Sequence, residues 1–267
     1  MSLEYGRTVD ALTDLHVVDN GADPSSPLVV VVHGAMDRAS SFGRVARSLS
    51  DLQVVRYDRR GYGRSVGAGP APLAVHVDDL LAVLAGRPAT VFGHSVGAVV
   101  ALVAAQSHPG LVRSVLAFEP PTPWLPWWPN RAGAAAEGAP ALDTDPADEA
   151  EAFMVAAVGE RIWARLPART RADRRAEGGA LRADLASLQG PAPFDPAAVS
   201  VPVVVGCGSQ TTWWHRQAAE ELAAALPVAE LAVVGGATHG AHLTHPSAMA
   251  ELVREAVAAS ERSEERR

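Results

Sequence analysis

Short apolar runs alternate along the chain with longer segments rich in alanine and other helix-forming residues. The apolar runs are the length of β-strands and occupy residues 28–33, 52–58, 89–94, 114–118, 201–206 and 229–234. The segments between them have the composition of helices and occupy residues 40–50, 72–86, 95–109, 213–227 and 246–260. Continuous apolar strands separated by helices are typical of a mostly parallel sheet covered on both faces. We therefore predict an α/β fold.

The alternation stops once, between residues 120 and 200. This stretch opens with prolines and tryptophans and continues with Ala-, Arg- and Glu-rich sequence that has no strand pattern. Residues 145–166 and 169–188 have the composition of amphipathic helices, and the first begins with Asp-Pro, a typical helix start. We predict a core formed by residues 1–119 and 201–267, into which residues 120–200 are inserted as a helical lid.

Composition and charge narrow the classes of partner. The formal net charge is −7 and no basic stripe is visible, so we expect a small-molecule substrate and no nucleic acid. The apolar runs are too short to cross a bilayer, so no membrane association is predicted. Cys207 is the single cysteine, which excludes an intramolecular disulfide, and the N-terminal sequence does not have the pattern of a signal peptide. The expected location is the cytoplasm, and the oligomeric state is left open.

The sequence Gly-His-Ser-Val-Gly at residues 93–97 lies between an apolar run and a helical pattern. A G-x-S-x-G sequence in this setting allows the sharp turn that holds a serine in a strained conformation with its hydroxyl exposed. The N-terminus of the following helix adds backbone N–H groups and positive potential beside the serine. We predict that Ser95 is a catalytic nucleophile.

A second glycine-containing loop, His-Gly-Ala-Met-Asp, follows the strand at 28–33. Small residues at this point let the backbone approach a reacting carbonyl group. We predict that the N–H groups of Ala35 and Val96 form an oxyanion hole, the donor pair that binds the negative oxygen of the transition state. His33 itself is expected to brace the loop.

Four segments of the chain resemble the α/β-hydrolase superfamily, and within it the lid-bearing hydrolases with an HG oxyanion loop and a GHSxG nucleophile turn. The segments read VVVVHGAMD, VVRYDRRGYGRS, VFGHSVGA and GATHGAHLTHP. The resemblance implies the α/β-hydrolase fold, the chain order nucleophile, acid, histidine, and a catalytic histidine at His239. The residues favour the same position, because a general base must reach the serine from a loop at the same sheet edge. Asp58, Arg59 and Arg60 in the second segment are expected to be structural.

The position of the catalytic acid departs from the commonest pattern of the superfamily. Many members have an aspartate just after the strand corresponding to 201–206, where this chain has Ser209. Glu119 instead ends the strand that follows the nucleophile's helix, at the sheet edge where loops converge. We predict that Glu119 accepts a hydrogen bond from His239 and that Pro120 keeps the backbone of Glu119 extended.

Two alternatives to this acid remain open. In the first, Ser209 or Gln210 orients the histidine as a neutral partner. In the second, Glu119 only binds loop amides. Asp37 and Asp58 follow earlier strands and are expected to brace turns or loops rather than to serve as the acid.

Aromatic residues gather at the start of the predicted lid. Trp124, Trp127 and Trp128 lie within five positions of one another, and aromatic rings suit an apolar pocket. With Met36 and Trp213 they are predicted to line the substrate pocket above the nucleophile. The alternative is that the tryptophans anchor the lid to the core.

Three histidines recur at intervals of three, which suggests a metal cluster. His239, His242 and His245 would need helical ligand spacing, and Gly240 and Pro246 interrupt a helix here. We therefore predict no metal site and no organic cofactor. The two later histidines are expected to pack in the loop or to cap a helix.

Together these features predict a serine hydrolase that acts through an acyl-enzyme on a small or medium, largely apolar ester. The same triad also supports carbon–carbon bond hydrolysis and perhydrolysis. A rival hypothesis is a small-molecule binding protein with a degenerate triad. A serine at position 95 speaks against the branches of the superfamily that use a carboxylate nucleophile.

Overall fold

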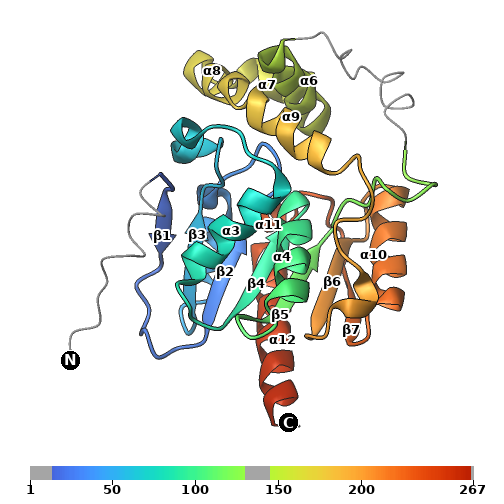
Figure 1. Cartoon of the computed structure of the whole chain (residues 1–267). Helices are drawn as coiled ribbons and strands as arrows, with labels where there is room; N and C mark the ends of the chain where they lie inside the picture. Colours follow the sequence, from blue (N-terminus) through green and yellow to red (C-terminus); the bar gives the residue numbers. More distant parts are fainter. Residues whose placement is uncertain (1–13, 130–144, 266–267) are drawn as a thin grey trace.

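The computed structural model describes residues 14–129 and 145–265. Within these residues a sheet of seven strands has the order β1-β3-β2-β4-β5-β6-β7 (Figure 1). The strands are β1 Val17–Asp19, β2 Leu28–Val32, β3 Gln53–Tyr57, β4 Ala89–His94, β5 Val112–Phe118, β6 Val203–Gly208 and β7 Ala229–Val234. β1 pairs antiparallel with β3, and the other neighbours are parallel. The predicted α/β fold with a mostly parallel sheet is confirmed.

All six apolar runs form strands, and the sequence pattern missed β1. This strand has three residues at the sheet edge, and none of them is buried. An edge strand without a buried face does not need an apolar run, so the pattern of hydrophobic residues does not reveal it.

Helices cover both faces of the sheet because the strands alternate buried side chains between two clusters. Val30 and Val32 of β2 pack on one face under α3 (Leu73–Leu84), α4 (Val96–Ser107) and α10 (Trp213–Ala225). Val29 and Val31 pack on the other face under α2 (Gly43–Arg47) and α12 (Pro246–Glu264). Full burial of each such side chain stabilises the fold by roughly 1.5–3 kcal/mol. The result is a sheet enclosed between two helical layers (Figure 1).

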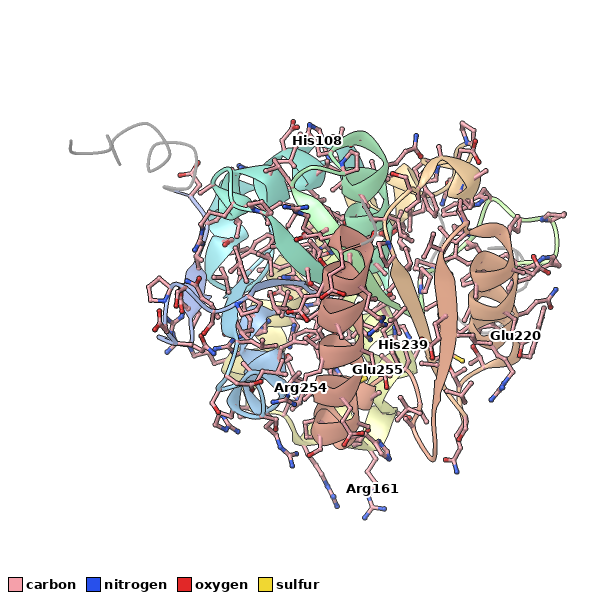
Figure 2. All side chains as sticks on the ribbon, turned by 90° about the horizontal axis from the view of Figure 1, so that it is seen from below. His108, Arg161, Glu220, His239, Arg254 and Glu255 are labelled. Carbon is pink, nitrogen blue, oxygen red and sulfur yellow. The ribbon has the colours of Figure 1, made fainter. Side chains whose placement is uncertain are left out.

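The last helix, α12, has the amphipathic pattern that such a layer requires. Leu252 and Val253 are buried against the sheet. Arg254 and Glu255 are exposed, and Figure 2 shows both side chains on this helix. The shorter elements are η1 Ala39–Phe42, η2 Gly63–Ala68, η3 Pro196–Ala198 and α11 Ala241–Thr244.

Four helices lie above the upper ends of the strands and form a separate helical layer (Figure 1). They are α6 Pro146–Val158, α7 Glu160–Arg165, α8 Ala168–Ala176 and α9 Gly178–Ser187. Each of the two predicted helical segments is therefore divided in two. Gly159, with φ +86°, ends α6, and the side chain of Asp145 caps that helix by accepting a hydrogen bond from Ala147 N at 2.9 Å. At the second break, a Cβ on Gly178 would lie 1.9 Å from Pro146 O, so glycine is required for α9 to approach α6.

A buried ion pair joins this helical layer to the core. The guanidinium of Arg59 donates two hydrogen bonds to the carboxylate of Asp184 on α9, at 2.9 and 2.6 Å, and both side chains are at most 1% exposed. Tyr62 donates a third hydrogen bond to Asp184 at 2.7 Å. Burial alone would raise the pKa of Asp184, but the charge and hydrogen bonds of Arg59 lower it below the usual range. Arg59 is structural, as the sequence predicts.

Replacing Asp184 with asparagine is expected to destabilise the fold by about 3–5 kcal/mol, because the buried charge of Arg59 loses its partner. Since the folded-state pKa of Asp184 is lowered, its contribution is present above the unfolded-state pKa of about 3.9 and is lost as pH falls below it. Denaturant unfolding at neutral and acid pH measures both effects.

The matched control is Asp78→Asn, which changes an exposed aspartate on α3. The control is expected to unfold like the wild type at each pH. Equal stability of Asp184→Asn and wild type at neutral pH would contradict a structural role for the pair.

Candidate active site

Ser95 occupies a sharp turn between β4 and α4. Its backbone has φ +53° and ψ −124°, and its N–H donates to Phe118 O on β5 at 2.9 Å. The flanking glycines are required by close contacts: a Cβ on Gly93 would lie 2.4 Å from Ala98 Cα, and one on Gly97 would lie 2.1 Å from Val32 O. The turn therefore has the strand, strained serine and helix that the G-x-S-x-G pattern predicts.

The loop after β2 runs directly beside this serine. A Cβ on Gly34 would lie 2.9 Å from the Cβ of Ser95, so the loop backbone approaches the turn as closely as glycine permits. Ala35 follows in this loop and is partly buried. Val96 is the first residue of α4, and the N–H groups at the start of a helix have no partner within the helix. The two predicted oxyanion donors therefore belong to backbone segments that border Ser95.

His33 braces the loop, as expected. Its Nε2 accepts a hydrogen bond from Arg59 N at 2.8 Å, so Nδ1 carries the proton and donates to Gly34 O at 2.7 Å. Burial, and then the charge of Arg59, lower the pKa of His33 to about 4. The ring is therefore neutral near pH 7, which the accepting role of Nε2 requires.

The structure brings Glu119 and His239 together although they are 120 positions apart. Nδ1 of His239 donates to Oε2 of Glu119 at 2.6 Å, and the glutamate side chain is fully buried while the histidine side chain is 41% exposed. Glu119 Oε1 accepts from Gly208 N at 2.8 Å, and Oε2 also accepts from the hydroxyl of Thr211 at 2.9 Å. These bonds fix the position of the carboxylate. Because Nδ1 of His239 bonds to Glu119, the other ring nitrogen, Nε2, is the one that can act as a base.

The electrostatics of Glu119 favour the ionised carboxylate. Burial would raise its pKa, but the hydrogen bond and charge of His239, with the N–H of Gly208, outweigh burial and lower the pKa below its ordinary value. An ionised carboxylate can stabilise a positive charge on the ring that it contacts.

The backbone of Glu119 differs from the prediction. Its φ is +47°, in the left-handed region, whereas Pro120 predicts an extended conformation. Glu119 N still donates to Gly206 O at 2.9 Å, so the chain turns while the residue is held in the sheet. The side-chain hydrogen bonds to Gly208 and Thr211 offset a strain on the order of 1–3 kcal/mol.

Backbone strain marks this region as a whole. Of the non-glycine residues that the structure describes, four have positive φ, and three of them are Met36, Ser95 and Glu119. Strained residues cluster at functional sites because such sites need side chains at unusual angles. The three strained residues belong to the loop after β2, the turn after β4 and the end of β5.

The other polar residues that follow strands make different contacts. Ser209 Oγ accepts a hydrogen bond from Gly236 N at 2.8 Å. Asp58 accepts from Ala39 N and Arg64 N, so it braces a turn as expected. Asp37 Oδ2 lies 3.1 Å from Nε2 of His242, and this contact joins the loop after β2 to the loop that carries His239.

Three further residues support His239, and the sequence reasoning missed them. His94 Nε2 donates to His239 O at 2.9 Å, which ties the histidine loop to the neighbour of Ser95. The ring of His215 stacks on that of His239 with centroids 4.6 Å apart and an angle of 11°. Thr211, in the loop between β6 and α10, donates a hydrogen bond to Glu119. The segment after β6 could have indicated two of them, because it has no aspartate near Ser209 but contains Thr211 and His215.

Two groups of side chains have potential metal-ligand atoms within 4.8 Å of one another. The first is Asp37, His94 and His242, and the second is Glu119, His215 and His239. The suspected trio of His239, His242 and His245 is not brought together as a cluster among the described residues. His242 instead stacks on Phe42 at 4.4 Å, and His245 precedes α12 as its N-cap residue. In the second group the closest atoms already form the bond between Glu119 and His239.

The predicted pocket residues differ in their exposure and in the residues that they contact. Met36 is 4% exposed and packs in the apolar cluster of the helical layer, and Trp128 packs edge-on against His215 at 5.5 Å. Trp127 donates to Glu221 on α10 at 3.0 Å, and Trp213 is 56% exposed. Trp124 packs against Phe194 at 6.1 Å. Met36 therefore lies in the loop after β2, Trp128 contacts the histidine that stacks on His239, and Trp127 contacts α10.

Comparison with known proteins agrees with this architecture. Residues 29–252 match the sequence profile described as "Alpha/beta hydrolase family", and the chain belongs to that family. An alpha/beta hydrolase of Sphaerobacter thermophilus is similar in structure, with a TM-score of 0.66 and 29% identity over 89% of this chain and 95% of that one.

Two curated relatives are similar in sequence over a shorter segment. "Uncharacterized hydrolase YraK" of Bacillus subtilis is 40% identical over 36% of this chain and 38% of its own length. "Lipase LipV" of Mycobacterium tuberculosis is 33% identical over 41% of this chain and 42% of its own length. The matched segments thus span less than half of either relative.

A helix that crosses a bilayer has about 20 predominantly apolar residues. None of the helices in residues 14–129 and 145–265 has the length and apolar character needed to span a membrane.

Proposed function

We propose that this protein is a serine hydrolase that cleaves a small or medium, largely apolar ester through an acyl-enzyme. The observation that carries the proposal is the bond of 2.6 Å between His239 Nδ1 and the buried carboxylate of Glu119, in a loop that His94 Nε2 ties to the turn carrying Ser95. Family membership supports a hydrolase, and the curated relatives include a protein called a lipase.

The chemistry follows from the roles of the individual groups. Ser95 Oγ attacks the ester carbonyl carbon while Nε2 of His239 takes the hydroxyl proton, and Glu119 stabilises the resulting imidazolium. The N–H groups of Ala35 and Val96 bind the oxyanion. The C–O bond then breaks, the leaving alcohol takes the proton from His239, and the acyl group remains on Ser95. Water, deprotonated by His239, releases the acid and restores the enzyme.

Several features favour an apolar acyl group of limited size. The helical layer covers the sheet edge at which these residues meet, and it joins the core through the Arg59–Asp184 pair. Met36 belongs to the apolar cluster between the core and the helical layer. Trp128 packs against His215, which stacks on His239. Apolar surroundings favour the binding of uncharged groups over charged ones. The helical layer is therefore proposed to serve as a lid over the site.

A panel of p-nitrophenyl esters tests the substrate class. We expect kcat/KM to be highest for butyrate or octanoate and to exceed the values for palmitate and for the charged hemisuccinate by about tenfold or more, because misfit and burial of charge both weaken transition-state binding. Turnover of none of these esters by a well-folded sample would contradict an esterase. Equal rates for hemisuccinate and butyrate would contradict the apolar pocket.

A further inference from the structure

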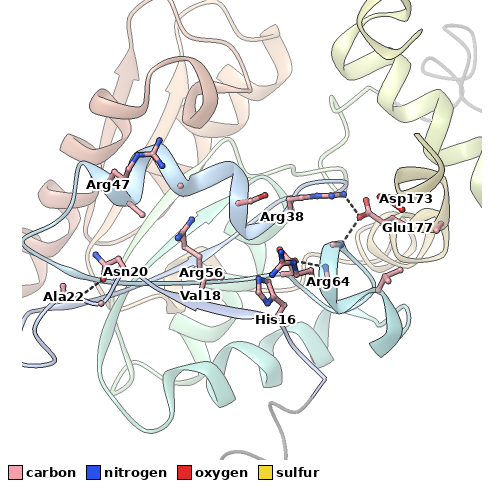
Figure 3. Close-up of a pocket in the computed structure, with 18 of the residues that line it drawn as sticks. His16, Val18, Asn20, Ala22, Arg38, Arg47, Arg56, Arg64, Asp173 and Glu177 are labelled. Atoms are coloured by element: carbon pink, nitrogen blue, oxygen red, sulfur yellow. Dashed lines mark hydrogen bonds and ion pairs between the residues drawn. The ribbon is translucent and has the colours of Figure 1, made fainter. Parts of the chain in front are cut away.

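A cavity of about 1110 Å³ (Figure 3) is lined by residues that include none of Ser95, Glu119 and His239. It is bordered by β1, β3, the segment from η1 to α2, and α8. The charged residues in its lining are the arginines Arg38, Arg47, Arg56, Arg64 and Arg169 and the acids Asp58, Asp173 and Glu177. Positive charge therefore predominates in this cavity, although the chain as a whole has a net charge of −7.

Two of these arginines converge on one point. A Cβ placed on Gly43 would lie 3.4 Å from Nη1 of Arg56 and 3.7 Å from Nη1 of Arg47. Arg56 donates to Ala39 O at 3.1 Å, and its Nε is buried without a hydrogen-bond partner among the described residues. Burial and the neighbouring charge of Arg47 lower the pKa of Arg56. Two guanidinium groups in this arrangement repel each other unless an anion lies between them.

The acids of the cavity do not supply that anion. Asp58 is engaged by two backbone N–H groups, and Glu177 by Arg38 at 2.6 Å. Asp173 lies beside Glu177, at the end of the cavity away from Arg47 (Figure 3). In the part of the chain that the structure describes, neither Arg47 nor Arg56 has a carboxylate within ion-pair distance.

We propose that this cavity binds a small soluble molecule that carries phosphate groups, held mainly by Arg47 and Arg56. The planar donor fork of arginine matches phosphate oxygens, and a group with two negative charges balances two guanidinium ions, which a single carboxylate does not. Among the lining residues Phe, Tyr and Trp are absent and His16 has the one aromatic ring, so the cavity offers little surface on which a nucleobase would stack. A diphosphate or a compact phosphate ester fits this chemistry.

Isothermal titration of inorganic pyrophosphate into the full chain tests this site without requiring hydrolase activity. Wild type is expected to bind one equivalent saturably. Arg56→Gln and Arg47→Gln should each weaken the affinity by about tenfold or more, because each removes charge-assisted hydrogen bonds to the ligand. The control Arg161→Gln removes the same charge from an exposed position on α7 and should bind like wild type.

Three results would overturn the proposal. The first is no saturable binding by wild type at millimolar pyrophosphate, and the second is an equal loss of affinity in Arg47→Gln and Arg161→Gln. The third is sedimentation with vesicles that contain phosphatidic acid in the absence of pyrophosphate binding, which would assign the phosphate to a lipid. Arg47 is exposed on α2, so its variant keeps the test decisive if Arg56→Gln misfolds.

Discussion

Ser95→Ala is expected to reduce ester turnover to background, a loss on the order of 10⁶-fold in kcat, because no other group can form the acyl-enzyme. The substitution removes one hydroxyl from a residue whose turn depends on its backbone: the N–H of Ser95 bonds to Phe118 O, and the neighbouring glycines make the close contacts. The fold should therefore remain intact. Steady-state hydrolysis of the preferred p-nitrophenyl ester measures the effect.

Ser107→Ala is the matched control for this variant. Ser107 ends the same helix, α4, and its hydroxyl donates to Val103 O at 2.8 Å at the surface. This variant should hydrolyse the ester at the wild-type rate. Turnover by Ser95→Ala comparable with that of Ser107→Ala would disprove the nucleophile assignment.

Glu119→Gln is expected to lower kcat by about 10²–10⁴-fold, by analogy with the loss of a triad acid. Glutamine keeps the volume of the side chain but removes the charge that stabilises a protonated His239. The bond of 2.6 Å from His239 Nδ1 to Oε2 would become a neutral amide contact, which does not hold the ring in one tautomer. KM should change little, because the carboxylate is buried and acts through the histidine.

Two comparisons distinguish this role from a purely structural one. Glu220→Gln removes an exposed carboxylate from α10 and should retain wild-type kinetics. If Glu119 only tied Gly208 and Thr211 to β5, its variant would lose thermal stability while its folded fraction retained kcat. Wild-type kcat in Glu119→Gln would return Ser209 or Gln210 to consideration.

Positions at the ends of strands could be predicted from the sequence because a parallel sheet brings the carboxyl ends of its strands together. Ser95, Glu119 and His239 each come after an apolar run. The alternation of strands and helices therefore places all three at the carboxyl ends of the strands. The bond between Glu119 and His239 is a consequence of that topology. The seven-stranded sheet was predicted except for its short antiparallel edge strand.

The support around the histidine depends on tertiary contacts that leave no local pattern. His215 stacks on His239 from the first turn of α10, and nothing in the spacing of the two residues indicates that contact. The positive φ of Glu119 opposes the preference set by Pro120, and hydrogen bonds to β6 and the following loop outweigh that preference. The arginine-lined cavity likewise combines Arg47 from a helix with Arg56 from a strand.

The most direct test of the central claim is a time course of intact mass during incubation with a small fluorophosphonate, with Ser95→Ala as the blank. An activated serine attacks the phosphorus and displaces fluoride, so wild type should gain the mass of one phosphonyl group and Ser95→Ala none. Glu119→Gln should be labelled at the same site but more slowly. A well-folded wild type that gains no mass, or a blank that is labelled equally, would contradict the assignment of Ser95 as an activated nucleophile.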